Sequence, residues 1–117
     1  FTKVGAAQLI ADCACADQFV LGPATTADWR AIDLAAHAVT GHVGAAVHQG
    51  IGANVLGDPR VALAWLVNEL SEIGVALEAG QVVTTGTCVV PIAVSPGDAL
   101  RADFGRLGEV SAAFADA

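Results

Sequence analysis

The stretch 84–88 reads TTGTC and places hydroxyl groups and a glycine between two valine-rich runs. Glycine lets a backbone come close to a ligand, and the flanking threonine hydroxyls can hydrogen-bond a carboxylate or a carbonyl oxygen. A bulge in a buried strand can require the same residue types. The residues alone therefore leave two interpretations open, a small-molecule site and a structural bulge.

Histidines are the usual candidates for acid–base chemistry or metal binding. The glycines of GHVG, at 41–44, predict a hairpin turn that sets His37 opposite His48. Two cross-strand histidines can begin a zinc site, but the hairpin offers no obvious third ligand, and Cys13 and Cys15 lack the spacing of a closed zinc motif. Surface histidines on strands are the favoured interpretation.

The segment IADCACAD, at 10–17, combines two carboxylates with two thiols. A reactive thiolate needs a neighbouring cation or a helix N-terminus, and neither is near in the sequence. Small side chains packed at a helix end are therefore favoured on local grounds.

Glycines also punctuate GIGANVLG, at 50–57. The spacing matches neither the dinucleotide fingerprint nor the phosphate loop, because no Lys-Ser or Lys-Thr follows the glycines. This segment is instead predicted to bend the chain between the hairpin and the following helix.

The composition describes one domain with much apolar surface. Of the 117 residues, 55% are hydrophobic and 15% are charged, which argues against disorder and indicates an oligomer or a missing partner. The net charge is −7 and the five basic residues are scattered, so nucleic acid is a poor partner.

Three further features bear on location and completeness. No apolar run is long enough to span a membrane, and no signal peptide is recognisable. The odd number of cysteines predicts reduced thiols in the cytoplasm. Because the sequence starts at Phe1 within an apolar run, we expect the chain to be part of a longer protein.

The clearest predicted element is an amphipathic helix at about 58–73. Asp58 is a favourable N-cap, and Pro59 occupies the first helical position, where its missing N–H costs nothing. Gly74 is expected to end the helix. Its apolar stripe at helical spacing consists of Leu63, Leu66, Leu70 and Ile73.

The remaining chain is predicted as one short helix, strands and turns. The short helix is expected to end near Cys15, and one helical turn falls within 24–33. Besides the hairpin, strands are expected at 18–23, 81–86, 89–94, 99–105 and 108–114. This order predicts an α+β domain of mostly antiparallel or mixed sheet, with the long helix packed on one face or end.

Longer stretches resemble a known enzyme family. The matching features are AWLVNEL at 64–70, LEAGQVVTTGT at 77–87 and PGDALRADFGRLGEVSAAF at 96–114, and the segment 4–22 aligns as well. They are similar to the C-terminal half of the 2-keto-4-pentenoate hydratase and 4-oxalocrotonate decarboxylase family, within the fumarylacetoacetate hydrolase superfamily. The resemblance covers essentially the whole chain.

The resemblance implies a lyase that uses Mg²⁺ or Mn²⁺ and acts on short 2-keto or 2-hydroxydienoate acids from the meta-cleavage of aromatic compounds. In such enzymes the metal chelates the 2-oxo carboxylate and eases enolisation, after which water adds or CO₂ leaves. The metal ligands and the catalytic lysine are expected upstream of Phe1, so no metal ligand is assigned to this chain.

Two sets of substrate-binding residues follow from the resemblance. Thr85, Gly86 and Thr87 match the family's Thr-Gly-Ser/Thr motif, whose hydroxyl and backbone N–H hold the substrate carboxylate. This match favours a site over a bulge at 84–88.

The second set lies in the first helix. Asp12 matches the family's Ala-Asp-Asn-Ala-Ser segment, and Cys13 and Cys15 stand where asparagine and serine are expected. Two polar groups that could orient substrate or water are therefore thiols here, which bears on the choice of substrate.

Two hypotheses of different classes are carried forward. The first is a hydratase for a 2-hydroxypenta-2,4-dienoate-type acid, with a 4-oxalocrotonate-type decarboxylase as its close alternative. The second is a non-catalytic family fragment that serves as an assembly partner. A homo-oligomer or a complementary chain is expected under both.

Overall fold

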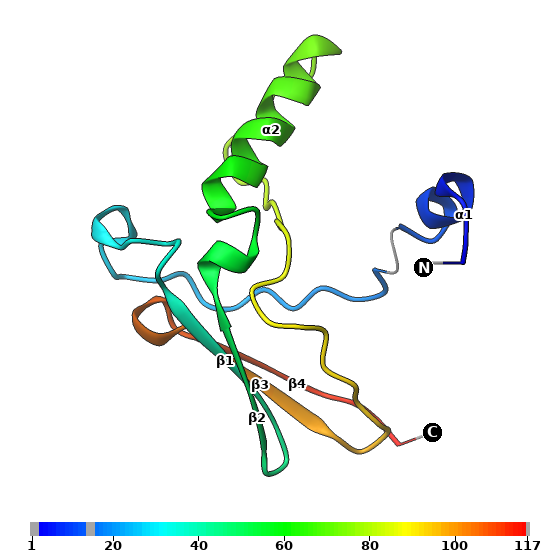
Figure 1. Ribbon diagram of the computed structural model, residues 1–117, viewed down its shortest axis with the longest axis vertical. Coiled ribbons are helices and arrows are strands. Elements are labelled where there is room, and N and C mark those ends of the chain that lie inside the picture. Colours follow the sequence, from blue (N-terminus) through cyan, green and yellow to red (C-terminus); the bar gives the residue numbers. More distant parts are fainter. Residues whose placement is uncertain (1–2, 14–15, 117) are drawn as a thin grey trace.

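The computed structural model describes residues 3–13 and 16–116, which form an antiparallel sheet and two helices that stand away from it (Figure 1). The four strands follow the order β2-β1-β3-β4, and each neighbouring pair is antiparallel. Their bounds are Ala38–Val43 (β1), Ala46–Ile51 (β2), Ala99–Asp103 (β3) and Glu109–Ala113 (β4). The predicted α+β class with an antiparallel sheet is confirmed.

The sheet has one polar and one apolar face, because successive side chains of a strand point to opposite sides. On the polar face Thr40 pairs with Asp103 and His42 with Arg101. Arg101 also forms an ion pair with Glu109 at 2.9 Å. The other face carries apolar and small residues of β1, β3 and β4, namely Val39, Gly41, Leu100, Ala102, Val110 and Ala112, and His48 of β2, which pairs with Gly41, lies on the same side. The apolar face is thus free to contact the segments that cross it.

Helix α2, Pro59–Glu72, confirms the predicted helix and its local signals. The Asp58 carboxylate accepts a hydrogen bond from the Arg60 backbone N–H at 2.8 Å, which caps the first turn. The helix ends before Gly74, whose φ of 75° suits the residue that follows a helix C-cap.

The predicted packing of this helix on the sheet is wrong. Figure 1 shows α2 pointing away from the sheet. Leu66 and Leu70 instead face a shallow cavity shared with 75–84, which runs back along the helix. The other two residues of the predicted stripe, Leu63 and Ile73, are exposed. Within the described residues, half of the stripe is therefore covered.

The Asp58 cap makes a pH-dependent contribution to stability. Hydrogen bonds from the Arg60 guanidinium and N–H hold the pKa of the Asp58 carboxyl below its ordinary value of 3.8. A lowered folded-state pKa stabilises the fold above the unfolded-state pKa, and this contribution is lost as the pH falls through the folded-state pKa. We expect Asp58→Ala to lower the Tm at neutral pH and to have little effect at about pH 2.

Circular dichroism melts of the wild type and Asp58→Ala at both pH values measure this difference. Asp58→Asn is the matched control, because it keeps the capping oxygen but cannot ionise. An Asp58→Ala effect of the same size at both pH values would contradict the ionic contribution.

Three segments predicted as strands are not strands in the structure. The segments 18–23, 81–86 and 89–94 have no ladder partner among the four strands. Their β-branched residues favour an extended backbone, but a strand also requires a hydrogen-bonded neighbour. Residues 83–89, Ile92 and Val94 line a cavity over the apolar face of the sheet instead.

The hairpin forms with a register different from the predicted one. Its turn begins at Gly44, which has a φ of 54°, and His48 pairs with Gly41. The prediction that His37 lies opposite His48 is therefore wrong. Gly41 serves close packing rather than the turn, because a Cβ there would lie 2.5 Å from Ile92 Cδ1.

Short helical pieces complete the chain. Helix α1, Ala6–Ala11, ends at Asp12, which is earlier than the predicted end near Cys15. A 3-10 turn at Trp29–Ala31 falls within the predicted loop, and another, η4, follows β3 at Gly105–Leu107. Neither α-helix of the described ranges has the length and apolar content needed to cross a bilayer.

Candidate functional site

A cavity of about 610 Å³ lies over the apolar face of the sheet. Val39, Gly41, Leu100 and Ala102 contribute the sheet side of its lining. The crossing segment 83–94 contributes another side, and Phe104 and Phe114 add aromatic rings. The cavity is therefore mostly apolar, as is common for sites that bind small organic molecules.

The polar part of the lining is the threonine-rich segment 84–88. The Thr87 hydroxyl donates a hydrogen bond to the Val89 carbonyl oxygen. The hydroxyls of Thr84 and Thr85 have no hydrogen-bond partner in the described part of the chain, and the backbone N–H groups of 85–87 likewise have no acceptor there. These donors are available to a ligand, and a carboxylate is the acceptor that suits several N–H and O–H groups at once.

The segment GIGANVLG lies directly against this polar wall. The Cys88 carbonyl oxygen accepts hydrogen bonds from the Ile51 N–H at 3.3 Å and from Asn54 Nδ2 at 2.7 Å. A Cβ on Gly50 would lie 2.2 Å from the Cys88 oxygen, so only glycine permits this approach. The glycines predicted to bend the chain thus also allow two backbone segments to meet.

Cys88 itself is partly buried beside the threonines. Burial raises the pKa of the Cys88 thiol above its ordinary value of 9.0, so the thiol is neutral at pH 7. A neutral thiol reacts slowly, and Cys88 forms part of the lining of the cavity.

The predicted residues of the first helix lie elsewhere. Asp12 caps the end of α1, and Figure 1 shows α1 well separated from the sheet and from the segment 83–94. Cys13 follows it and is exposed, while Cys15 lies outside the described residues. The structure therefore does not bring Asp12 and Cys13 together with Thr85–Thr87, and their role in binding stays a prediction.

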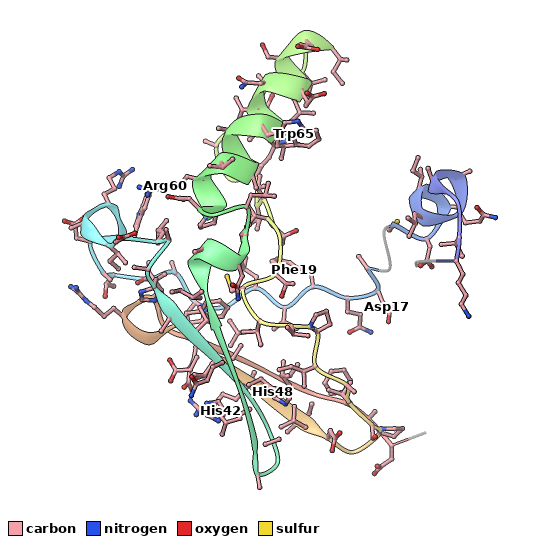
Figure 2. The ribbon with its side chains drawn as sticks, in the orientation of Figure 1. Asp17, Phe19, His42, His48, Arg60 and Trp65 are labelled. Carbon is pink, nitrogen blue, oxygen red and sulfur yellow. The ribbon has the colours of Figure 1, made fainter. Side chains whose placement is uncertain are left out.

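The histidines are spread over the sheet. His37 Nε2 lies 2.6 Å from the Phe104 carbonyl oxygen and joins the start of β1 to the end of β3. His42 and His48 sit on the hairpin (Figure 2), but on opposite faces, because His48 pairs with Gly41. Across residues 3–13 and 16–116 no three His, Cys, Asp or Glu side chains gather in a way that could hold a metal ion.

Several residues of the site carried no signal in the sequence. Asn54 reaches a carbonyl 34 positions along the chain, which no local pattern predicts. Ile92 and Phe104 line the cavity only because the segment 83–94 and the end of β3 come together. Their apolar character is typical of core residues, so composition alone does not separate them from the core.

Sequence relatives place these observations in a wider context. No family model matches the chain. A 2-keto-4-pentenoate hydratase of Burkholderia vietnamiensis is 38% identical over 92% of this chain and 41% of its own length. A 2-oxo-hept-4-ene-1,7-dioate hydratase of Escherichia coli is 38% identical over 56% of this chain and 24% of its own length. The chain thus spans less than half the length of these relatives.

Solved structures give the same result for the fold. A 4-oxalocrotonate decarboxylase from Pseudomonas putida G7, complexed with calcium and acetate, superimposes with a TM-score of 0.79 and 34% identity. The match covers 91% of this chain and 41% of that protein. The same decarboxylase complexed with magnesium and adipate superimposes with a TM-score of 0.78.

Proposed function

Because the chain belongs to the 2-keto-4-pentenoate hydratase and 4-oxalocrotonate decarboxylase family, we propose that it forms part of a lyase that adds water to a 2-hydroxypenta-2,4-dienoate-type acid. The position of 85–87 carries this proposal, because these residues present free donors at the edge of a cavity that is otherwise apolar. Such a wall suits a small acid with one charged end and one hydrocarbon end.

Within this site each group has a distinct task. The Thr85 hydroxyl and the N–H groups of Gly86 and Thr87 bind the carboxylate of the substrate. Ile92 and Phe104 contact its hydrocarbon part and exclude water from it. Water addition transfers a hydroxyl to one carbon and a proton to another, so the reaction needs no oxidant or reductant. The groups that move the proton are assigned to sequence outside this chain.

A divalent metal is part of the proposal for the complete protein. The solved relatives were complexed with calcium or magnesium, and we propose Mg²⁺ or Mn²⁺ here. The described residues do not fit this ion by themselves, since they contain no suitable group of His, Cys, Asp and Glu. Its ligands are therefore proposed to lie upstream of Phe1 or on a complementary chain, and this chain supplies substrate-binding residues only.

Two other functions have specific support. A decarboxylase acting on a 4-oxalocrotonate-type acid is supported by the TM-score of 0.79 to such an enzyme. A non-catalytic assembly partner is supported by the exposed apolar surface, which includes Phe19 at 60% and Trp65 at 61% exposure (Figure 2). The same surface supports an oligomer or a complementary chain. The free thiols of Cys13 and Cys88 are consistent with the cytoplasm as the proposed location.

The intact mass of the purified protein is the first test, and the second is an assay. A mass near 11.7 kDa would favour the assembly partner, whereas a mass roughly two and a half times that, as the coverage of 41% of a relative's length implies, would favour a complete enzyme. For the larger protein we expect loss of the dienoate absorbance of 2-hydroxypenta-2,4-dienoate with Mg²⁺, no turnover with EDTA, and recovery when Mg²⁺ is added back.

The products separate the remaining alternatives. A 4-hydroxy-2-oxo acid identifies a hydratase, and release of CO₂ from 4-oxalocrotonate identifies a decarboxylase. A protein of the larger mass that transforms neither acid in the presence of Mg²⁺ would refute the proposed lyase.

A further inference from the structure

We propose that Asn54 is a positioning residue that holds the segment 85–88 in place beside the cavity. This inference rests on the proposed role of 85–87 in binding a carboxylate. Asn54 ends the 3-10 turn η3, Gly52–Asn54, directly after strand β2. The turn belongs to the glycine-rich segment 50–57, which matches no phosphate-binding motif.

The first observation is the hydrogen bonding of one carbonyl group. Asn54 Nδ2 donates to the Cys88 oxygen at 2.7 Å, and the Ile51 N–H donates to the same oxygen at 3.3 Å. The next carbonyl, that of Val89, accepts the Thr87 hydroxyl. Two consecutive peptide groups that follow 85–87 are thus held by hydrogen bonds, and the Asn54 bond is the shorter of the two to Cys88.

The second observation is close packing at both ends of the same contact. A Cβ on Gly50 would lie 2.2 Å from the Cys88 oxygen, and a Cβ on Gly86 would lie 3.2 Å from Val55 Cγ1. Val55 is only 2% exposed and so provides a fixed surface beneath Gly86. The residues 50–55 therefore form a cradle that supports 86–88 from one side.

The third observation is the lack of a strand partner. The segment 81–94 has no ladder partner in the described part of the sheet, so its position depends on side-chain packing, such as that of Ile92 on Gly41, and on the contacts with 50–55. Removing the Asn54 donor leaves the Cys88 oxygen with the longer bond alone. The N–H groups of 85–87 then lose the fixed direction on which tight binding of a carboxylate depends.

Two substitutions of Asn54 and one control test this role in the protein at its natural length. Asn54→Ala removes the side chain, and Asn54→Asp keeps its shape but cannot donate a hydrogen bond when ionised. Asn68→Ala, on the exposed side of α2, is the matched control. The readout is the rate at which iodoacetamide alkylates Cys88, resolved by peptide mass spectrometry, with exposed Cys13 as the internal reference.

A second readout reports ligand binding. The ligand is 2-oxopentanoate, a saturated 2-oxo acid that cannot add water. We measure, in the presence of Mg²⁺, the concentration of this acid that halves the rate of Cys88 alkylation. We expect both Asn54 substitutions to raise the Cys88 alkylation rate and the half-protecting concentration about fivefold, the factor that one hydrogen bond typically contributes. Asn68→Ala and the Cys13 rate are expected to stay unchanged.

Other results would overturn the role of Asn54. Rates for Asn54→Ala equal to those of Asn68→Ala would show that the contact does not hold the segment, and wild-type rates for Asn54→Asp would show that the donor is not needed. A parallel rise at Cys13 would indicate general loosening instead of positioning. If 2-oxopentanoate fails to protect wild-type Cys88, the carboxylate site itself is refuted, while the ligand-free rates still report on the Asn54 contact.

Discussion

Gly52→Ala is expected to destabilise the fold by about 3 kcal/mol, the upper range for forcing an extra carbon into a packed site. A Cβ at this position would lie 1.8 Å from the Leu34 carbonyl oxygen and 2.9 Å from its carbon. Both are backbone atoms, so no side-chain rotation relieves the overlap. The Gly52 N–H also donates to the His37 carbonyl oxygen at 3.0 Å, which holds the two segments together at this point.

The free energy of unfolding, from urea denaturation, measures this effect. Gly44→Ala is the matched control, because nothing lies within 4 Å of a Cβ there and only its φ of +54° is unfavourable. That conformation alone costs about 1 kcal/mol for alanine. Equal losses for the two substitutions would contradict the argument, since they would mean that the chain at Leu34 moves aside without cost.

The two glycines illustrate how far the sequence predicts this fold. Gly44 forms a turn, and Gly52 allows the backbone to approach that of Leu34 closely. In the sequence, however, nothing distinguishes these two roles, because both residues are glycines in a hydrophobic stretch. The glycines of GHVG predict a turn because turns favour glycine, but Gly41 is needed for contact with Ile92. The predicted register of the hairpin is wrong for this reason.

Local signals predict the elements that depend on local physics. Helix α2 begins after Asp58 and ends before Gly74, as predicted, because capping and backbone conformation involve only neighbouring residues. The strands β3 and β4 also lie within predicted ranges. By contrast, the valine-rich residues 81–94 have the composition of strands but lack a hydrogen-bonded neighbouring strand. Their own sequence cannot predict whether such a neighbour is present.

The candidate site shows the same division. The resemblance to a family selected Thr85, Gly86 and Thr87, and the structure places these residues on the wall of a cavity. The groups that support them, Asn54 and Gly50, belong to a segment more than 30 positions earlier, and only the structure shows that this segment contacts the site. Sequence patterns thus indicate which groups can bind a ligand, and tertiary contacts decide which of them are held still.

Thr85→Val is expected to weaken binding of the proposed substrate acid tenfold or more without changing stability. The Thr85 hydroxyl has no partner within residues 3–13 and 16–116, so its removal leaves no protein group unsatisfied. A hydrogen bond to a charged group contributes about 1.5–3 kcal/mol, which corresponds to at least tenfold in KM. Valine has nearly the same shape, so the cavity keeps its volume.

Comparison with two other threonines makes the measurement specific. Thr87→Val removes the bond to the Val89 oxygen and is expected to lower the free energy of unfolding by about 1 kcal/mol as well as the affinity. Thr26→Val, at an exposed position outside the cavity lining, is expected to change neither. An equal KM for Thr85→Val and Thr26→Val would contradict the assignment of Thr85 to the carboxylate. A loss confined to Thr87→Val would instead mean that the segment binds through its backbone N–H groups, with the hydroxyl of Thr87 fixing their direction.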